Sequence, residues 1–91
     1  MDKFLKIKDF GDLYGDNVSE VDIMLPVDIN KRLDVYHKYV EFVNTRMSCV
    51  EHYTTVLDPQ VSDVGISSKF IFPKSESAML FKLGTADIQA H

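Results

Sequence analysis

The sequence predicts an α+β domain in which a small, mainly antiparallel sheet is covered on one face by one long and one short helix. Residues 28–47 have a helical period, residues 50–57 and 66–72 alternate with a period of two, and residues 76–83 return to a helical pattern. The predicted order is (β)βαββα. A partial ferredoxin-like arrangement fits this order, and a β-grasp arrangement is the alternative that remains open.

Residues 28–47 predict the long helix around which the rest is organised. The following apolar residues recur at spacings of three and four, which places them on one stripe: Ile29, Leu33, Tyr36, Val40, Val43 and Met47. Val35, Tyr39 and Phe42 widen this stripe on one side. Val40 is at its centre and is predicted to be buried. Asp28 is suited to cap the first turn, and Arg46 lies near the negative end of the helix dipole.

The segment before this helix predicts strand, loop and strand. Residues 4–8 alternate weakly and predict a short first strand, which would decide between the two arrangements. Residues 9–20 combine glycines with acids, as loops do, and Leu13 and Tyr14 could attach this loop to the core. Residues 21–25 predict a strand that ends at Pro26 because proline has no N–H to donate.

Two alternating segments predict an antiparallel hairpin after the helix. Residues 50–57 would place Val50, His52, Thr54 and Val56 on one face, and residues 58–60 would break the strand at Pro59. Residues 61–65 complete the connection, and residues 66–72 form the second strand.

The last part of the chain predicts a short helix and a loosely held tail. Ser75 could cap a helix over residues 76–83, in which Met79, Leu80 and Leu83 share one face. Gly84 would provide a left-handed exit. Residues 85–91 form the tail, in which Ile88 could dock on the core.

Length and composition predict one domain, residues 1–91, with a modest core that a homodimer would enlarge. No stretch is long and apolar enough to predict a transmembrane helix, and the first residues lack a signal-peptide pattern, so we expect a cytoplasmic protein. A single cysteine, Cys49, agrees with a reducing compartment because it has no partner for an internal disulfide.

The net charge of −4 is unevenly distributed. Residues 9–28 contain six acids and no Lys or Arg, whereas the other 71 residues carry 10 bases and 8 acids. Such a segment repels phosphate backbones and favours a protein partner with a basic surface. The predicted partner-binding residues are Asp9, Asp12, Tyr14, Asp16 and Glu20. The alternative is a solvated acidic loop.

A nucleic-acid-binding module is a second functional hypothesis. An open sheet that carries Tyr53, Phe70 and Phe72 beside cations could stack bases. The candidate residues for this role are Tyr53, Lys69 and Lys74. The same aromatic residues also fit the core, because they belong to the alternating faces that the helix must cover.

A small enzyme or metal protein is the third hypothesis. Cys49 and His52 form one Cys-x-x-His pair, to which His37 or His91 could add a ligand, but structural zinc sites normally show two spaced pairs. Cys49 lacks a local nucleophile motif, and no phosphate-binding loop is present. We therefore assign no metal ligand, catalytic residue or cofactor, and expect Cys49 to be a buried structural thiol.

Phe70-Ile71-Phe72, followed by residues 78–83, resembles the C-terminal strand and helix of small accessory proteins of large tailed bacteriophages. The resemblance implies a phage origin and a setting in the host cytoplasm, and it carries over no catalytic or binding residue. Together with the acidic segment, it leads us to expect a small non-enzymatic regulatory protein, such as an inhibitor, that binds and modulates a host protein.

Overall fold

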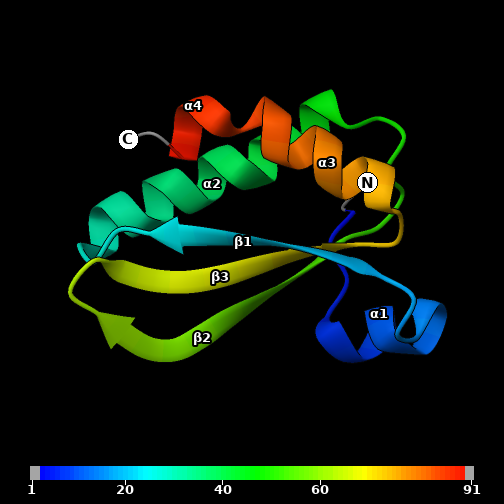
Figure 1. Ribbon diagram of the computed structural model, residues 1–91, viewed down its shortest axis with the longest axis horizontal. Helices are drawn as coiled ribbons and strands as arrows, with labels where there is room; N and C mark the ends of the chain where they lie inside the picture. Colours follow the sequence, from blue (N-terminus) through cyan, green and yellow to red (C-terminus); the bar gives the residue numbers. More distant parts are fainter. Residues whose placement is uncertain (1–2, 90–91) are drawn as a thin grey trace.

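The computed structural model describes residues 3–89, except for the side chains of residues 58–62 and 89, and confirms the α+β prediction. The elements follow one another in the order α1 (Ile7–Tyr14), β1 (Ser19–Leu25), α2 (Ile29–Arg46), β2 (Thr54–Ser62), β3 (Gly65–Phe72), α3 (Ser75–Gly84) and α4 (Ala86–Gln89). Figure 1 shows α2, α3 and α4 on one face of the sheet and α1 on the other. No helix within residues 3–89 is both long and apolar enough to cross a membrane.

The sheet has the order β1-β3-β2, and β3 is antiparallel to both of its neighbours. β1 and β2 therefore run parallel to each other and are connected by α2, which forms a split β-α-β unit and agrees with the partial ferredoxin-like prediction. A β-grasp arrangement needs a further strand before the long helix. The described residues before β1 contain α1 instead, and Phe4 forms only an isolated parallel bridge with Tyr53.

The predictions for residues 4–20 were wrong, because α1 begins inside the predicted strand at residues 4–8 and takes up half of the predicted loop at residues 9–20. Phe10 and Tyr14 lie one turn apart, and their rings pack together at a centroid distance of 4.8 Å. Phe10 is 2% exposed, whereas Leu13 is exposed and does not attach the segment. Ile7, Phe10 and Tyr14 recur at spacings of three and four residues, but this pattern covers only two turns and contains Gly11, so the same residues also fit a loop.

The predicted long helix and its cap are confirmed. The Asp28 carboxylate accepts hydrogen bonds from the backbone N–H groups of Asn30 and Lys31 at 2.9 and 3.2 Å. At the other end, the Lys3 ammonium donates to the carbonyl oxygens of Val43 and Met47 at 3.3 and 2.8 Å. Lys3, rather than Arg46, therefore provides the charge-assisted contact at the negative end of the dipole.

The predicted apolar arc of α2 contains all of the buried positions, but burial is centred on its widened side and not on Val40. The buried positions are Val35, Tyr39, Val43 and then Met47, at intervals of four residues. Val40 is only partly buried, and Ile29 and Leu33 are exposed, at 62% and 53%. The buried face of α2 contacts α3 as well as the sheet. The ring of Phe42 packs against that of Phe81 in α3, at a centroid distance of 6.2 Å.

The β2–β3 hairpin is confirmed, but its predicted strand boundaries were not. Residues 58–60 do not end β2, because pairing resumes at Val61 after a register shift that follows Leu57. The turn is then only two residues long, between Ser62 and Gly65. Val50 and Tyr53 are both buried although they are three residues apart, so the alternation predicted before residue 54 was wrong.

The short C-terminal helix is confirmed, but its predicted core face was wrong. Ser77, Ala78 and Phe81 are buried, whereas Met79, Leu80 and Leu83 are exposed. Ser75 is the first helical residue and not the cap, and Lys74 occupies the cap position without a side-chain hydrogen bond.

The prediction for Gly84, the last residue of α3, was also wrong. Gly84 lies within α3 and has no positive φ, so it does not provide a left-handed exit. A β-carbon at Gly84 would overlap the Phe42 ring, which shows that this glycine allows α2 and α3 to approach closely. After α3, residues 86–89 form α4 and not a loose tail, and Ile88 docks on the core as predicted. Residues 90 and 91 lie outside the described part of the chain.

Aromatic rings fill the core between the sheet and the helices. The Phe81 ring contacts those of Phe70, Phe72 and Tyr39, at centroid distances of 4.8, 5.1 and 5.7 Å. Tyr39 is fully buried, and its hydroxyl has no hydrogen-bond partner among the described residues. This burial raises the pKa of Tyr39 above its ordinary value, because the ionised phenolate would lose its hydration.

We expect Tyr39→Phe to raise the free energy of unfolding by about 1 kcal/mol, because the change removes a buried polar atom that lacks a partner and keeps the ring. Tyr36→Phe is the matched control. The Tyr36 hydroxyl forms a hydrogen bond with Thr55 Oγ1 at 3.1 Å, so its loss should lower stability by about 1 kcal/mol. Urea unfolding of both variants measures the difference. Equal losses of stability in the two variants would show that the Tyr39 hydroxyl is not a buried group without a partner.

Candidate partner-binding surface

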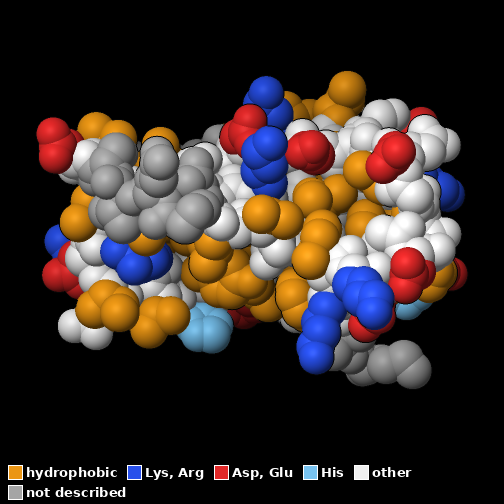
Figure 2. All heavy atoms as spheres, turned by 90° about the horizontal axis from the view of Figure 1, so that it is seen from below, with side chains coloured by type: hydrophobic (Ala, Val, Ile, Leu, Met, Phe, Trp, Pro, Cys, Tyr) orange, Lys and Arg blue, Asp and Glu red, His pale blue; other side chains and the backbone are white. Residues whose placement is uncertain are grey.

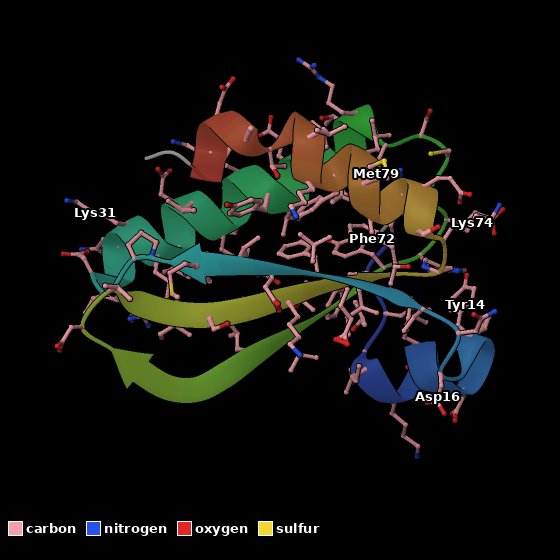
Figure 3. The ribbon with its side chains drawn as sticks, viewed as in Figure 1. Tyr14, Asp16, Lys31, Phe72, Lys74 and Met79 are labelled. Carbon is pink, nitrogen blue, oxygen red and sulfur yellow. The ribbon has the colours of Figure 1, made fainter. Side chains whose placement is uncertain are left out.

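The acids of α1 and its following turn face solvent. Asp9 and Asp12 are exposed on the helix, and Asp16 is exposed in the turn after Gly15. Among the described residues, none of these three carboxylates forms an ion pair. Figure 3 shows Tyr14 on the side of α1 toward the sheet and Asp16 on the opposite side. The acidic surface of α1 (Asp9, Asp12 and Asp16) is therefore available to a partner.

Tyr14, the aromatic member of the predicted partner-binding set, attaches α1 to the rest of the fold. It is partly buried, and its hydroxyl forms a hydrogen bond with His52 Nδ1 at 2.8 Å. His52 belongs to the segment that precedes β2, 38 residues along the chain. Tyr14 therefore holds the acidic surface in position.

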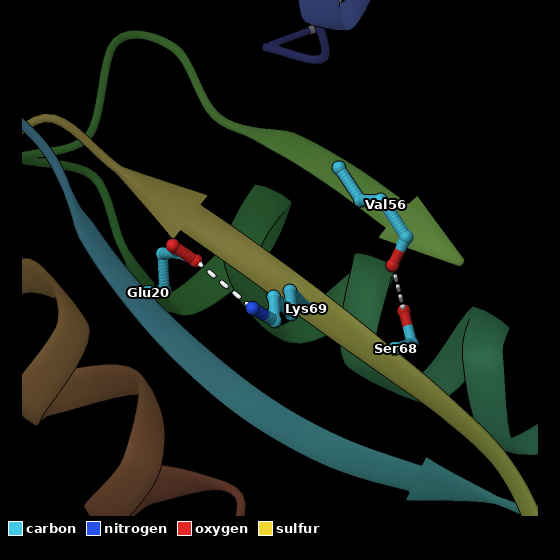
Figure 4. Close-up of polar contacts among 4 residues, drawn as sticks. All are labelled: Glu20, Val56, Ser68 and Lys69. Carbon is cyan, nitrogen blue, oxygen red and sulfur yellow. Dashed lines mark hydrogen bonds and ion pairs between the residues drawn. The ribbon is translucent and has the colours of Figure 1, made fainter. Parts of the chain in front are cut away.

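The other acids of residues 9–28 have structural roles or lie on the sheet. The Glu20 carboxylate pairs with the Lys69 ammonium at 3.4 Å across β1 and β3 (Figure 4). Asp22 is the register partner of Lys69, and Asp28 caps α2. Glu20 therefore has a compensating cation, although residues 9–28 contain no Lys or Arg. Lys69 is distant in sequence, so only strand pairing brings it close.

The predicted base-stacking surface does not form. Tyr53 is 1% exposed, and Phe70 and Phe72 are fully buried. These rings face α2 and α3, and Figure 3 shows Phe72 between the sheet and α3. Lys69 is exposed on the opposite sheet face beside Glu20, and Lys74 is exposed at the start of α3. The aromatic and cationic members of the set therefore do not share a surface.

Cys49 is exposed, which contradicts the expected buried thiol. It lies in the turn between α2 and β2 and lines a small groove of about 210 Å³. The groove is lined by Tyr14, Cys49, Val50, Glu51, Pro73, Lys74 and Ser77. These residues come from distant parts of the chain, so the groove could not be predicted from the sequence. Its volume is below the range of about 300–1,000 Å³ that is usual for small-molecule sites.

No group of three or more His, Cys, Asp or Glu side chains within the described residues is arranged to hold a metal ion. Of the predicted Cys49–His52 pair, Cys49 lines the groove, and His52 forms a hydrogen bond with Tyr14, which lines the same groove. His91 lies outside the described residues.

The face that carries α1 combines apolar and charged side chains. Figure 2 shows this face from below, with hydrophobic side chains gathered near its middle and charges of both signs around them. Strand alternation places Met24 and Val56 on this side of the sheet, where they are 45% and 39% exposed. Such a mixture of apolar centre and polar surroundings is typical of protein–protein interfaces.

Comparison with known proteins gave no match, either to a protein-family model, to a curated protein or to a solved structure. Function is therefore inferred from the surfaces just described. Of these, the acidic surface of α1 and the neighbouring outer face of the sheet combine exposed charge with exposed apolar area.

Proposed function

We propose that this protein is a small, non-enzymatic regulatory protein that binds a partner protein with a basic surface through the acidic surface of α1. The observation that carries the proposal is the exposure of Asp9, Asp12 and Asp16 without an ion pair among the described residues. The three carboxylates repel one another in the free protein, and the neighbouring Lys6 and Lys8 form no ion pair with them among the described residues. A cationic partner surface would relieve that repulsion.

Apolar side chains beside these acids supply the contact area that charge alone does not provide. Ile7 and Leu13 of α1 are 54% and 59% exposed. Interfacial charges mainly set the rate of encounter and the choice of partner, whereas buried apolar area holds the complex together. α1 offers both kinds of group on one short helix.

The resemblance of residues 70–72 and 78–83 to bacteriophage accessory proteins supports a further part of the proposal, that the protein is phage-encoded and modulates a host protein in the cytoplasm. A homodimer is compatible with this function. Light scattering of the purified protein over a range of concentrations would establish the oligomeric state independently of the partner.

We expect the double variant Asp12→Asn/Asp16→Asn to slow association with the partner by about three- to tenfold at low salt and to flatten its salt dependence. The melting temperature should stay level or rise, because the change relieves self-repulsion. The matched control is Asp34→Asn/Glu41→Gln, which removes two exposed charges from α2. This control should leave association almost unchanged.

The partner is first captured from host cytoplasm with and without nuclease, and association rates are then measured with the purified partner at two salt concentrations. Equal association rates for the two double variants would exclude the acidic surface of α1 as the partner-binding site. Loss of all captured protein after nuclease treatment would instead favour nucleic-acid binding, which Lys69 and Lys74 variants would then test.

A further inference from the structure

β1 is an edge strand with a regular, unpaired side. All seven of its residues pair with β3 without a register shift, from Ser19 opposite Phe72 to Leu25 opposite Ile66. On its other side, β1 makes no backbone hydrogen bond to any described residue. An edge of this kind presents a row of N–H and C=O groups on which another strand can pair.

The opposite edge, formed by β2, is protected against such pairing. The N-terminal segment pairs with the residue just before β2, since Leu5 N–H donates to the Tyr53 carbonyl and Tyr53 N–H donates to the Lys3 carbonyl. The register shift after Leu57 distorts its middle, and Pro59 lacks an N–H group. Bulges and prolines are the usual means by which proteins block strand addition. Neither is present in β1.

The topology leaves a strand position open beside β1. α3 packs on both β1 and β3, as a helix does when it crosses a sheet toward the next strand (Figure 1). In a complete β-α-β-β-α-β arrangement, a fourth strand follows this second crossover and runs parallel to β3, hence antiparallel to β1. Here the described chain continues from α3 into α4. The place of the fourth strand is therefore not filled by the described residues.

The side chains of β1 define what can occupy this position. Glu20, Asp22 and Met24 are exposed on the outer face, and the residues between them are buried on the helix-covered face. Asp22 forms no ion pair among the described residues. A second copy of β1 fits poorly, because antiparallel pairing centred on Asp22 would place two carboxylates directly opposite each other. A strand with cations at alternate positions would be complementary.

We propose that the edge of β1 binds an extended segment of the partner protein as a fourth strand, antiparallel to β1. The segment carries Lys or Arg opposite Asp22 and Glu20 and an apolar residue opposite Met24. Its alternate side chains are apolar and extend the layer formed by Val21 and Ile23. This inference rests on the proposed function, and it specifies the chemistry and the binding mode of the partner.

The test uses a synthetic peptide, acetyl-Val-Leu-Val-Lys-Val-Lys-Thr-amide, designed to pair antiparallel with residues 19–25. Titration into the ¹⁵N-labelled protein should shift the amide signals of β1 and slow their hydrogen exchange, and intermolecular NOEs should connect the peptide to β1 and not to β2. The control peptide has the same sequence with N-methyl groups on the alternate residues whose N–H groups would face β1. It keeps the charges but cannot complete a strand ladder, and it should not bind.

A charge exchange tests the side-chain register. Asp22→Lys should weaken the lysine peptide about tenfold and favour the same peptide with Glu in place of both Lys residues, because cross-strand pairs of opposite charge attract. Circular dichroism confirms that the variant remains folded. Equal binding of the N-methylated peptide, signals that shift only outside β1, or no binding at millimolar peptide would overturn the inference.

The outcome is separable from that of the proposed function. The peptide test needs no natural partner and does not depend on the acids of α1. Partner association that is insensitive to Asp12→Asn/Asp16→Asn would exclude the acidic surface of α1 while strand addition to β1 could still be observed. Conversely, failure of the peptide would leave the role of α1 intact.

Discussion

Val43→Asp is expected to unfold the protein, whereas Leu33→Asp is expected to leave it folded. Val43 is fully buried in the core face of α2, but Leu33 is 53% exposed near the start of the helix. An unpaired charge in the core costs several kcal/mol, which is comparable with the whole stability of a domain of this size, about 5–15 kcal/mol. A charge at an exposed position should cost no more than about 1 kcal/mol.

The two variants test which face of α2 is buried, because the helical period alone places Leu33 and Val43 on the same apolar stripe. Circular dichroism and urea unfolding report whether each variant is folded and how stable it is. A folded Val43→Asp protein, or similar losses in the two variants, would show that α2 buries a different face from the one described.

Gly65→Ala should be strongly destabilising, by about 3 kcal/mol or more, although it adds a single methyl group. Gly65 has a φ of 142°, a conformation that residues with a side chain rarely adopt. A β-carbon there would overlap the carbonyl oxygen of Leu25 and lie 3.3 Å from Met24 Cγ. Because this oxygen is a backbone atom of β1, the overlap can be relieved only if β1 or β3 moves.

Gly11→Ala is the matched control. Gly11 is exposed within α1, and a β-carbon there has no neighbour within 4 Å. The change should stabilise the protein by about 0.5–1 kcal/mol, because glycine loses more conformational freedom than alanine in a helix. Urea unfolding of both variants measures these opposite effects. Destabilisation by Gly11→Ala would contradict the helical assignment of residues 7–14, and a neutral Gly65→Ala would contradict the contact between β1 and the hairpin.

Much of the fold was determined by the sequence alone, where local chemistry and periodicity agree. Asp28 caps α2 as its position before a long amphipathic stretch predicts, and Pro26 follows the last residue of β1. The β2–β3 hairpin follows from two alternating segments close in sequence. In these cases, the interactions that fix the element lie within a few residues of one another, so the sequence contains the whole signal.

Only the tertiary structure decided which faces are buried and which surfaces remain open. The buried face of α2 includes the side that contacts Phe81 of α3, whereas Leu33 lies on the other side of the apolar arc and is exposed. Strand pairing brings Lys69 to Glu20, and the order of the strands leaves the outer side of β1 unpaired. The helical period identifies an apolar arc of α2, but its burial depends on elements far away in the sequence. The charge of residues 9–28 could therefore be predicted, whereas the open strand edge of β1 within this segment could not.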